Sequence, residues 1–301
     1  MGTPEFASIS LERLYRDGHD IAGVFTQADK PGNRGMKVMT NPVKELALSF
    51  NTPVYQPVTL KDGNTAGIIK DLQCELITVV AYGKLLPKEI IELPPLGCIN
   101  IHGSLLPKYR GASPVQQAVI NGEKETGVTS MYISEEMDAG DILLTKKTFI
   151  GDDETAVDLL KKLSHLGAEL LSETVKEISL GKIKRKQQNH DEATYAPLLT
   201  RDMSPIDWNK SAFTIKCMVR GLQPWPVATM MLDGSLLKVF AVDICEEKTG
   251  KEPGCIISFG NHGVEIACCD GSIIIKEVQA PGGKRMPAAD FIRGNPIKST
   301  Q

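Results

Sequence analysis

The feature that most constrains the fold is an alternation of apolar runs with helical segments in the N-terminal half of the chain. Residues 75–83 (ELITVVAYG) and 96–102 (LGCINIH) are continuous apolar runs rich in β-branched side chains. Such runs are typical of strands covered on both faces of a sheet. Residues 21–25 predict another strand, and residues 127–134 and 141–150 predict two that pair with each other.

Amphipathic helices are predicted between and after these strands, over residues 42–50, 113–123 and 153–181. Pro42 and Pro114 stand near the helix starts, where a missing N–H does no harm. Strands that alternate with helices indicate an α/β fold with an open, mainly parallel sheet. The sequence therefore predicts an α/β domain over residues 1–180.

The pattern of apolar and polar residues changes after Gly181. Residues 182–197 are polar and basic without an apolar period, so residues 181–200 are predicted to be a basic linker. A helix over 211–222 follows, and then five short strands separated by turns. This pattern predicts a small β-barrel or sandwich as a second domain over residues 201–301.

Composition narrows the class of protein. A chain of 301 residues with 42% hydrophobic and 24% charged residues is typical of a globular protein with two domains. The net charge of −3 argues against a dedicated nucleic-acid binder. No apolar run approaches the ~18–20 residues of a membrane helix. Seven cysteines without a CxxC motif predict reduced thiols in a cytoplasm, and no metal-ligand cluster is expected.

The chain opens on MGTPEFA, where Gly2 and Thr3 leave a strand and Glu5 begins a helix. Several apolar residues would ordinarily precede such a glycine in a sheet of this type. We expect either a very short first strand or a true start that lies upstream.

Two polar residues end the second apolar run. Asn100 and His102 are two positions apart, so on a strand they project from the same face. Ligands bind at the carboxyl ends of strands in open parallel sheets. An amide donor and an imidazole at that place can stabilise an oxyanion and transfer a proton. The alternative is that both side chains satisfy backbone groups of the following loop.

A second candidate element lies in residues 127–144. Asp138 stands between a predicted strand and Ala139-Gly140, a turn that can fold its carboxylate back over the sheet edge. Asp141 competes for the same role. An aspartate in a turn is more often an Asx-turn or a cap, so spacing alone leaves both readings open.

Together the two segments resemble a known family. NIHGSLLPKYRG (100–111) followed by GVTSMYISEEMDAGDILL (127–144) is similar to the paired motifs of the folate-dependent formyltransferase family. The resemblance implies a Rossmann-like catalytic domain, an OB-like C-terminal barrel and 10-formyltetrahydrofolate as co-substrate. It also implies a catalytic set of three residues, Asn100, His102 and Asp138.

The loop after His102 is implied to line the folate site, through Ser104, Leu105, Leu106 and Pro107. Three of these four residues are apolar in a loop, where polar residues are usual. We therefore expect them to form a wall for the flat pterin or its linker. No metal is needed for this chemistry.

Further stretches along essentially the whole chain resemble the branch of the family that formylates methionyl-tRNA: residues 2–7, 26–35, 220–226 and 281–294. That resemblance implies a partner, initiator methionyl-tRNA, a role in translation initiation, and a protein that works as a monomer. The implied tRNA contacts are basic side chains at two places, Lys30, Arg34 and Lys37 in one loop and Lys184 and Arg185 in the linker.

Two rival functions stay open. One is another enzyme of the family, such as a glycinamide ribonucleotide formyltransferase or a formyltetrahydrofolate hydrolase. The C-terminal domain counts against the purine enzyme, which lacks one. The other is a catalytically silent RNA-binding module, against which the intact Asn100, His102 and Asp138 count.

Overall fold

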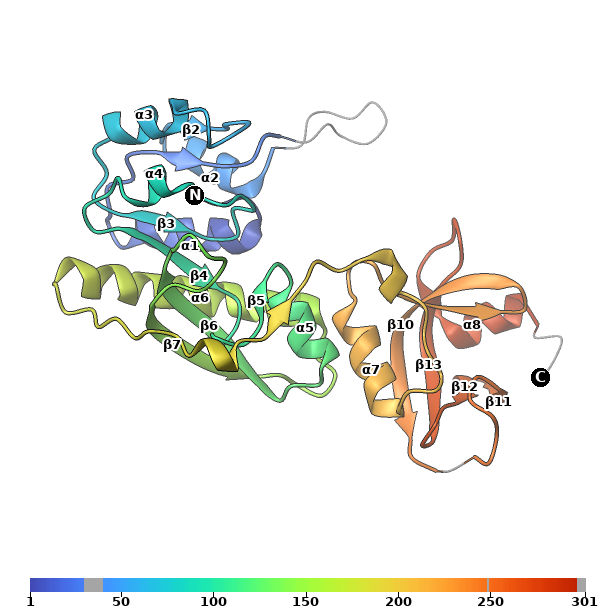
Figure 1. Cartoon of the computed structure of the whole chain (residues 1–301). Coiled ribbons are helices and arrows are strands. Elements are labelled where there is room, and N and C mark those ends of the chain that lie inside the picture. The colour runs from blue at the N-terminus through green and yellow to red at the C-terminus, as the bar shows by residue number, and fades with distance from the viewer. Residues whose placement is uncertain (30–39, 248, 297–301) are drawn as a thin grey trace. The chain divides into compact units, whose positions relative to one another are not determined.

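A computed structural model describes residues 1–29, 40–247 and 249–296 (Figure 1). Its internal contacts divide the chain into two compact units. Unit 1 comprises Met1–Pro114, Glu125–Phe149 and Leu160–Ala196, and unit 2 comprises Val115–Lys124, Ile150–Leu159 and Pro197–Gln301. Both units are therefore assembled from separate stretches of sequence. The sequence-based domain ranges stay a prediction.

Unit 1 is built on a mixed sheet. Strand β3 (Ile77–Val79) is parallel to β4 (Cys98–His102), β4 is antiparallel to β6 (Glu125–Tyr132), and β6 is antiparallel to β7 (Ile142–Phe149). Two smaller parallel pairs accompany it, β1 (Val24–Phe25) with β2 (Val54–Tyr55) and β5 (Arg110–Gly111) with β8 (Tyr195–Ala196). The predicted α/β class is confirmed, and so is the pairing of the two strands after residue 125.

Helices cover both faces of this sheet. Helices α1 (Glu5–Arg16) and α6 (Ala156–Ser179) lie on one face, where Gly167 of α6 lets Ile101 of β4 and Phe6 of α1 approach closely. The other face packs against α3 (Asn64–Asp71) and α4 (Lys88–Ile91). Helix α2 (Pro42–Ser49) packs on α1, while α5 (Pro114–Ile120) follows β5 in the chain and belongs, except for Pro114, to unit 2. The predicted helices over 42–50, 113–123 and 153–181 are confirmed.

Unit 2 has an antiparallel sheet in the order β11-β12-β13-β10-β9. The strands are β9 (Ala228–Leu232), β10 (Ser235–Cys245), β11 (Ile256–Gly260), β12 (Gly263–Ala267), β13 (Ser272–Gln279) and a short β14 (Met286–Pro287). Helices α7 (Ala212–Gly221) and α8 (Ala288–Gly294) pack on it, and the 3-10 turn η2 (Arg201–Met203) precedes it. The other 3-10 turn, η1 (His190–Glu192), belongs to unit 1. Among the described residues, no pairing of β11 with β9 closes this sheet into a barrel.

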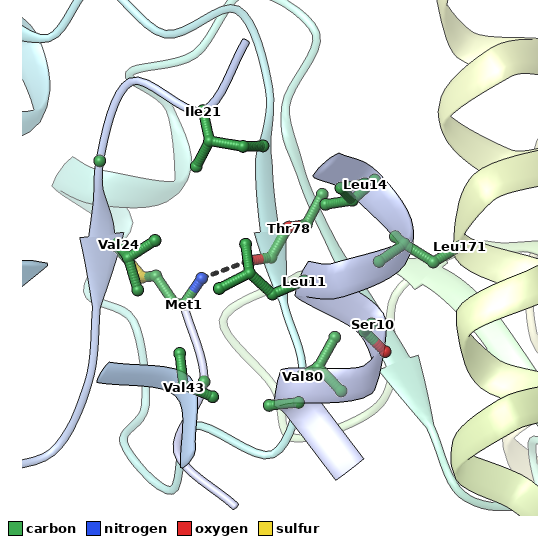
Figure 2. A pocket seen from close by; sticks show the side chains of 13 residues that line it. Met1, Ser10, Leu11, Leu14, Ile21, Val24, Val43, Thr78, Val80 and Leu171 are labelled. Atoms are coloured by element: carbon green, nitrogen blue, oxygen red, sulfur yellow. Dashed lines mark hydrogen bonds between the residues drawn. The ribbon is translucent and has the colours of Figure 1, made fainter. Parts of the chain in front are cut away.

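The first two residues complete the sheet of unit 1. Gly2 bridges in parallel to Val80 just after β3, and its N–H donates to the carbonyl of Phe25 in β1 at 3.0 Å. The amine of Met1 donates to the carbonyl of Thr78 at 2.7 Å (Figure 2). Apolar side chains surround this amine, including Leu11. Met1 as a whole is half-buried, but its amine lies inside the sheet.

This burial predicts a pH-dependent stability. Desolvation lowers the pKa of the Met1 amine from 8.0 to about 6. Between these values the unfolded chain binds more protons than the folded one, so the free energy of unfolding rises with pH. We expect about 2–3 kcal/mol of stability to be present above pH 8 and lost as the pH falls to 6. Denaturant unfolding at several pH values measures it.

The control is the same protein acetylated at Met1, which keeps an N–H donor but carries no titrating amine. The difference between the two pH profiles isolates Met1 from other titrating groups. Parallel profiles for the free and acetylated proteins would show that the amine is hydrated in solution.

Candidate active site

Strand β4 presents the two predicted polar residues on one face. Ile101 points toward α6 and α1, while the Sγ of Cys98 lies 3.7 Å from the carbonyl oxygen of Ile90 in α4. Because side chains alternate along a strand, Asn100 and His102 share the face of Cys98. They stand at the carboxyl end of β4, where the chain turns into the loop that begins at Gly103.

His102 is held by a backbone acceptor. The ring is 6% exposed, and its Nε2 lies 2.8 Å from the carbonyl oxygen of Tyr109. A carbonyl only accepts hydrogen bonds, so Nε2 carries a hydrogen and donates it. Nδ1 is then the nitrogen left for chemistry, and it lies 3.7 Å from Oδ2 of Asp138. A proton exchanged with a substrate would therefore pass through Nδ1, beside the carboxylate.

Asp138 reaches this position from a strained turn. Its φ of 53° lies in the left-handed region, and its Oδ2 accepts a hydrogen bond from the N–H of Gly111 at 2.8 Å. Gly140 is required nearby, because a Cβ there would meet the carbonyl oxygen of Tyr132 at 1.8 Å. Asp141 accepts from the N–H of Tyr132 through its backbone carbonyl. The carboxylate that faces His102 is therefore that of Asp138.

The amide of Asn100 is partly exposed and makes no side-chain hydrogen bond to the described residues. It is therefore available to donate to an oxygen of a bound substrate. Across the strand pair, Asn100 is opposite Met131 of β6. Met131 is itself buried against Leu106 and Ile142.

The loop after His102 is anchored on β6. Thr129 donates through its Oγ1 to the carbonyl of Ser104 at 2.6 Å and accepts from the N–H of Leu106 at 3.1 Å. Ser104 is fully buried and donates to the carbonyl of Lys108 at 2.6 Å. Leu106 is buried against Met131 and Ile142.

Only two members of the predicted folate wall are partly exposed. Leu105 lies against Gly127 at the start of β6, and Pro107 follows the buried Leu106. Within this loop, Leu105 and Pro107 are therefore the two predicted side chains that a ligand could reach, whereas Ser104 and Leu106 are buried and hold the loop. The folate role of the loop stays a prediction.

The predicted tRNA contacts divide into two groups. Lys30, Arg34 and Lys37 lie outside the described residues. Lys184 is exposed in the segment after α6. Arg185 places its guanidinium 4.0 Å from the ring centre of Tyr132, at the end of β6.

Sequence reasoning missed the segment that completes this site. Residues 186–196, here called the return segment, run back along unit 1 instead of leading away from it. Lys186 and Ile142 exchange two backbone hydrogen bonds, and β8 pairs with β5 at the end of the loop after His102. Its Gln188 is buried and accepts from the buried guanidinium of Arg110 at 2.7 Å. No apolar period marks this segment, so periodicity could not reveal it.

Comparison with known proteins identifies the family. Residues 1–175 match the family model described as formyl transferase, and residues 198–296 match the formyl transferase C-terminal domain. The chain belongs to the formyltransferase family. It is 48% identical to the methionyl-tRNA formyltransferase of Alkaliphilus oremlandii over 99% of this chain and 96% of that protein. It is 46% identical to that of Acetivibrio thermocellus, with the same coverage.

A solved formyltransferase shares the fold. The N-formyltransferase of Helicobacter canadensis, in complex with folinic acid and dTDP-3-aminofucose, is 19% identical with a TM-score of 0.69. The match covers 95% of this chain and 97% of that one. In the described residues of the present chain, no helix is long and apolar enough to span a membrane. No group of three metal-ligating side chains occurs in that part either.

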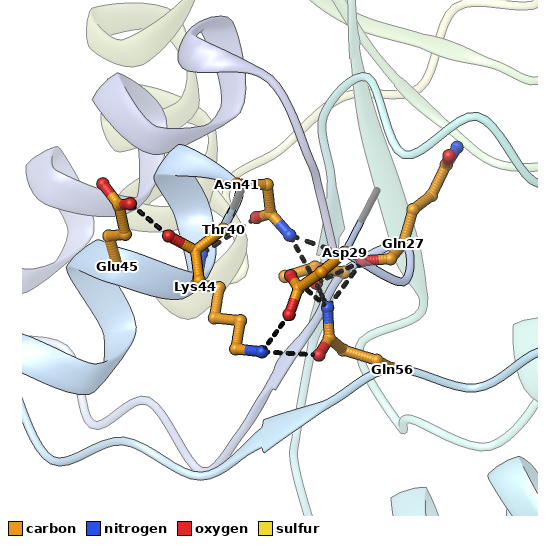
Figure 3. A network of polar contacts seen from close by, with 8 residues as sticks. Gln27, Asp29, Thr40, Asn41, Lys44, Glu45 and Gln56 are labelled. Atoms are coloured by element: carbon orange, nitrogen blue, oxygen red, sulfur yellow. Dashed lines mark hydrogen bonds and ion pairs between the residues drawn. The ribbon is translucent and has the colours of Figure 1, made fainter. Parts of the chain in front are cut away.

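A polar network joins neighbouring strand ends of this formyltransferase (Figure 3). The Nε2 of Gln56, after β2, donates to the carbonyl of Gln27 at 2.8 Å and to Asp29 at 3.0 Å. Asp29 forms an ion pair with Lys44 of α2 at 2.5 Å. Gln27 donates in turn to the carbonyl of Tyr82, beyond β3. The carboxyl ends of β1 and β3 are thereby fixed together.

Proposed function

We propose that this chain is a methionyl-tRNA formyltransferase. It transfers the formyl group of 10-formyltetrahydrofolate to the α-amino group of methionine on initiator methionyl-tRNA, for translation initiation. The observation that carries the proposal is the convergence of Asn100, His102 and Asp138 at the end of β4 in a chain 48% identical to such an enzyme.

The three side chains suit acyl transfer to an amine. The amine attacks the formyl carbon, the carbonyl oxygen becomes an oxyanion, and the bond to the folate nitrogen then breaks. Asn100 donates its amide N–H to the oxygen that gains charge. His102 takes a proton at Nδ1 and returns it to the leaving nitrogen. Asp138 stabilises the protonated ring.

One assay tests this function. The purified protein is incubated with 10-formyltetrahydrofolate and either methionyl-initiator tRNA or glycinamide ribonucleotide. We expect formylated methionyl-tRNA and no formylated ribonucleotide. Formylation of the ribonucleotide alone, or release of formate without either acceptor, would assign the chain to another activity of the family. Binding of tRNA without any turnover would indicate an RNA-binding module.

We further propose that the chain acts as a monomer in a reducing cytoplasm. All seven cysteines are free, which fits that compartment. Sedimentation at the concentration of the assay checks the monomer, and a dimer there would contradict it.

Lys184 is proposed to contact a tRNA phosphate, because its exposed charge lies on the segment next to the site. Lys184→Ala should raise KM for initiator and acceptor-stem-variant methionyl-tRNA alike. The slope of log KM against log salt should fall by about 1. Steady-state kinetics over a salt series measures both effects.

Lys70→Ala is the matched control, since it removes the same charge from an exposed position on α3. It should leave KM and the salt slope unchanged. Lys184→Ala alone is a cleaner test than a double variant with Arg185, because Arg185 also stacks on Tyr132. Equal effects of Lys70→Ala and Lys184→Ala would show that tRNA binding depends on the overall charge of the protein and not on a contact made by Lys184.

A further inference from the structure

The side-chain amide of Gln188 uses both of its ends. Gln188 is 5% exposed, and its Nε2 donates to the backbone carbonyls of Asp138 and Gly140, each at 2.8 Å. Its Oε1 accepts from Nη2 of Arg110 at 2.7 Å and from Nε at 3.2 Å. A rotated amide would turn an oxygen toward two carbonyl oxygens and an NH₂ toward a cation. Only one orientation therefore satisfies its neighbours.

These contacts fall on both ends of the turn that carries the Asp138 carboxylate. The left-handed conformation of Asp138 is unfavourable for an L-residue, so the turn needs support. The N–H of Gly111 holds the carboxylate, and Gln188 holds the backbone on either side of Ala139. Together, the hydrogen bond from Gly111 and the two from Gln188 direct the carboxylate toward His102.

The buried cation behind Gln188 points to a role beyond stability. Arg110 is 3% exposed, and among the described residues its guanidinium contacts the side chains of Gln188 and His190 and no carboxylate. Burying a guanidinium without a carboxylate partner costs free energy that an apolar side chain would not. Its charge, placed at Oε1, polarises the amide and strengthens the two hydrogen bonds that Nε2 donates.

We propose that Gln188 is a positioning residue for the reaction, fixed by Arg110, and that it acts by holding the Asp138 turn against His102. This inference rests on the proposed function. It makes the return segment, which begins beyond the long helix α6, a part of the active site.

Gln188→Met tests the proposal, because methionine fills the space and donates no hydrogen bond. We expect kcat to fall ~10–100-fold, since a misplacement of about 1 Å at a reacting group can have that effect. KM for 10-formyltetrahydrofolate and for methionyl-tRNA should stay unchanged. Gln187→Met, the same change at the neighbouring exposed glutamine, should leave kcat unchanged.

A second variant separates positioning from folding. Gln188→Glu keeps an acceptor for Arg110 but removes the two donated hydrogen bonds. It should lose kcat as Gln188→Met does, when kcat is measured well below the thermal unfolding midpoint of the variant so that all of the protein is folded. Normal turnover in either Gln188 variant would overturn the proposal.

The decisive measurement is a double-mutant cycle with Asp138→Ala. If Gln188 acts through the carboxylate of Asp138, Gln188→Met should cost nothing further in the Asp138→Ala protein. The same fold-loss in both backgrounds would show that Gln188 only supports the fold. Failure of the proposed function is seen separately, as a wild-type protein that does not formylate methionyl-tRNA at all.

Discussion

Replacing His102 with alanine should lower kcat by ~10²–10⁴-fold, the usual loss when a positioned acid–base group is removed. The reason lies in the division of labour between the ring nitrogens. Nε2 donates to the carbonyl of Tyr109, so the ring cannot turn away, and Nδ1 is left to exchange a proton beside Asp138. Single-turnover formylation of methionyl-tRNA measures the loss without interference from product release.

His102→Gln is the sharper variant of the pair. Its amide can still donate to the carbonyl of Tyr109, but it cannot take up a proton at neutral pH. We expect it to fold as the wild type does and to be as inactive as His102→Ala. His165→Ala, on the exposed side of α6, is the control and should be fully active. Wild-type turnover by His102→Gln would show that the imidazole of His102 has only a structural role.

Asn100→Ala should lower kcat by ~10²–10³-fold, as the loss of one oxyanion donor does. The amide of Asn100 has no side-chain partner among the described residues, so it is free to donate to the substrate oxygen as the proposed function requires. The hydrogen bond strengthens as the oxygen gains charge. KM should therefore change far less than kcat.

Asn100→Asp separates the amide N–H from the shape of the side chain. A carboxylate of nearly the same size would face the oxyanion with like charge, so this variant should be at least as inactive as Asn100→Ala. Thermal unfolding of both variants checks that β4 is intact. High turnover by Asn100→Asp would mean that the oxyanion is stabilised elsewhere.

The sequence predicted the part of the site that lies on one strand. Period-2 alternation through the apolar run of residues 96–102 placed Asn100 and His102 on the same face, and the structure has them there. The turn that carries Asp138 could also be predicted, because Ala139-Gly140 follows it in the sequence. Spacing alone could not decide between Asp138 and Asp141, because that choice depends on the contacts of Asp138 with the N–H of Gly111 and with Gln188.

The rest could not be predicted, because apolar periodicity detects burial and not pairing. The buried residues of the run 75–83 extend from Ile77 to Tyr82, yet only Ile77–Val79 form strand β3. Ala81 and Gly83 have positive φ values of 45° and 75°, which end the strand inside the apolar run. The return segment is the converse case, since polar hydrogen bonds hold it and leave no apolar signal.

The place of the return segment in the chain has a consequence for synthesis on the ribosome. His102 and Asp138 emerge well before Gln188, and β5 has no partner until Tyr195 and Ala196 have followed. A nascent chain that ends before Gln188 carries the three proposed catalytic side chains but lacks the two hydrogen bonds that Gln188 donates to the backbone of the Asp138 turn. An enzyme whose product starts protein synthesis therefore gains a working site only after more than half of its own translation is complete.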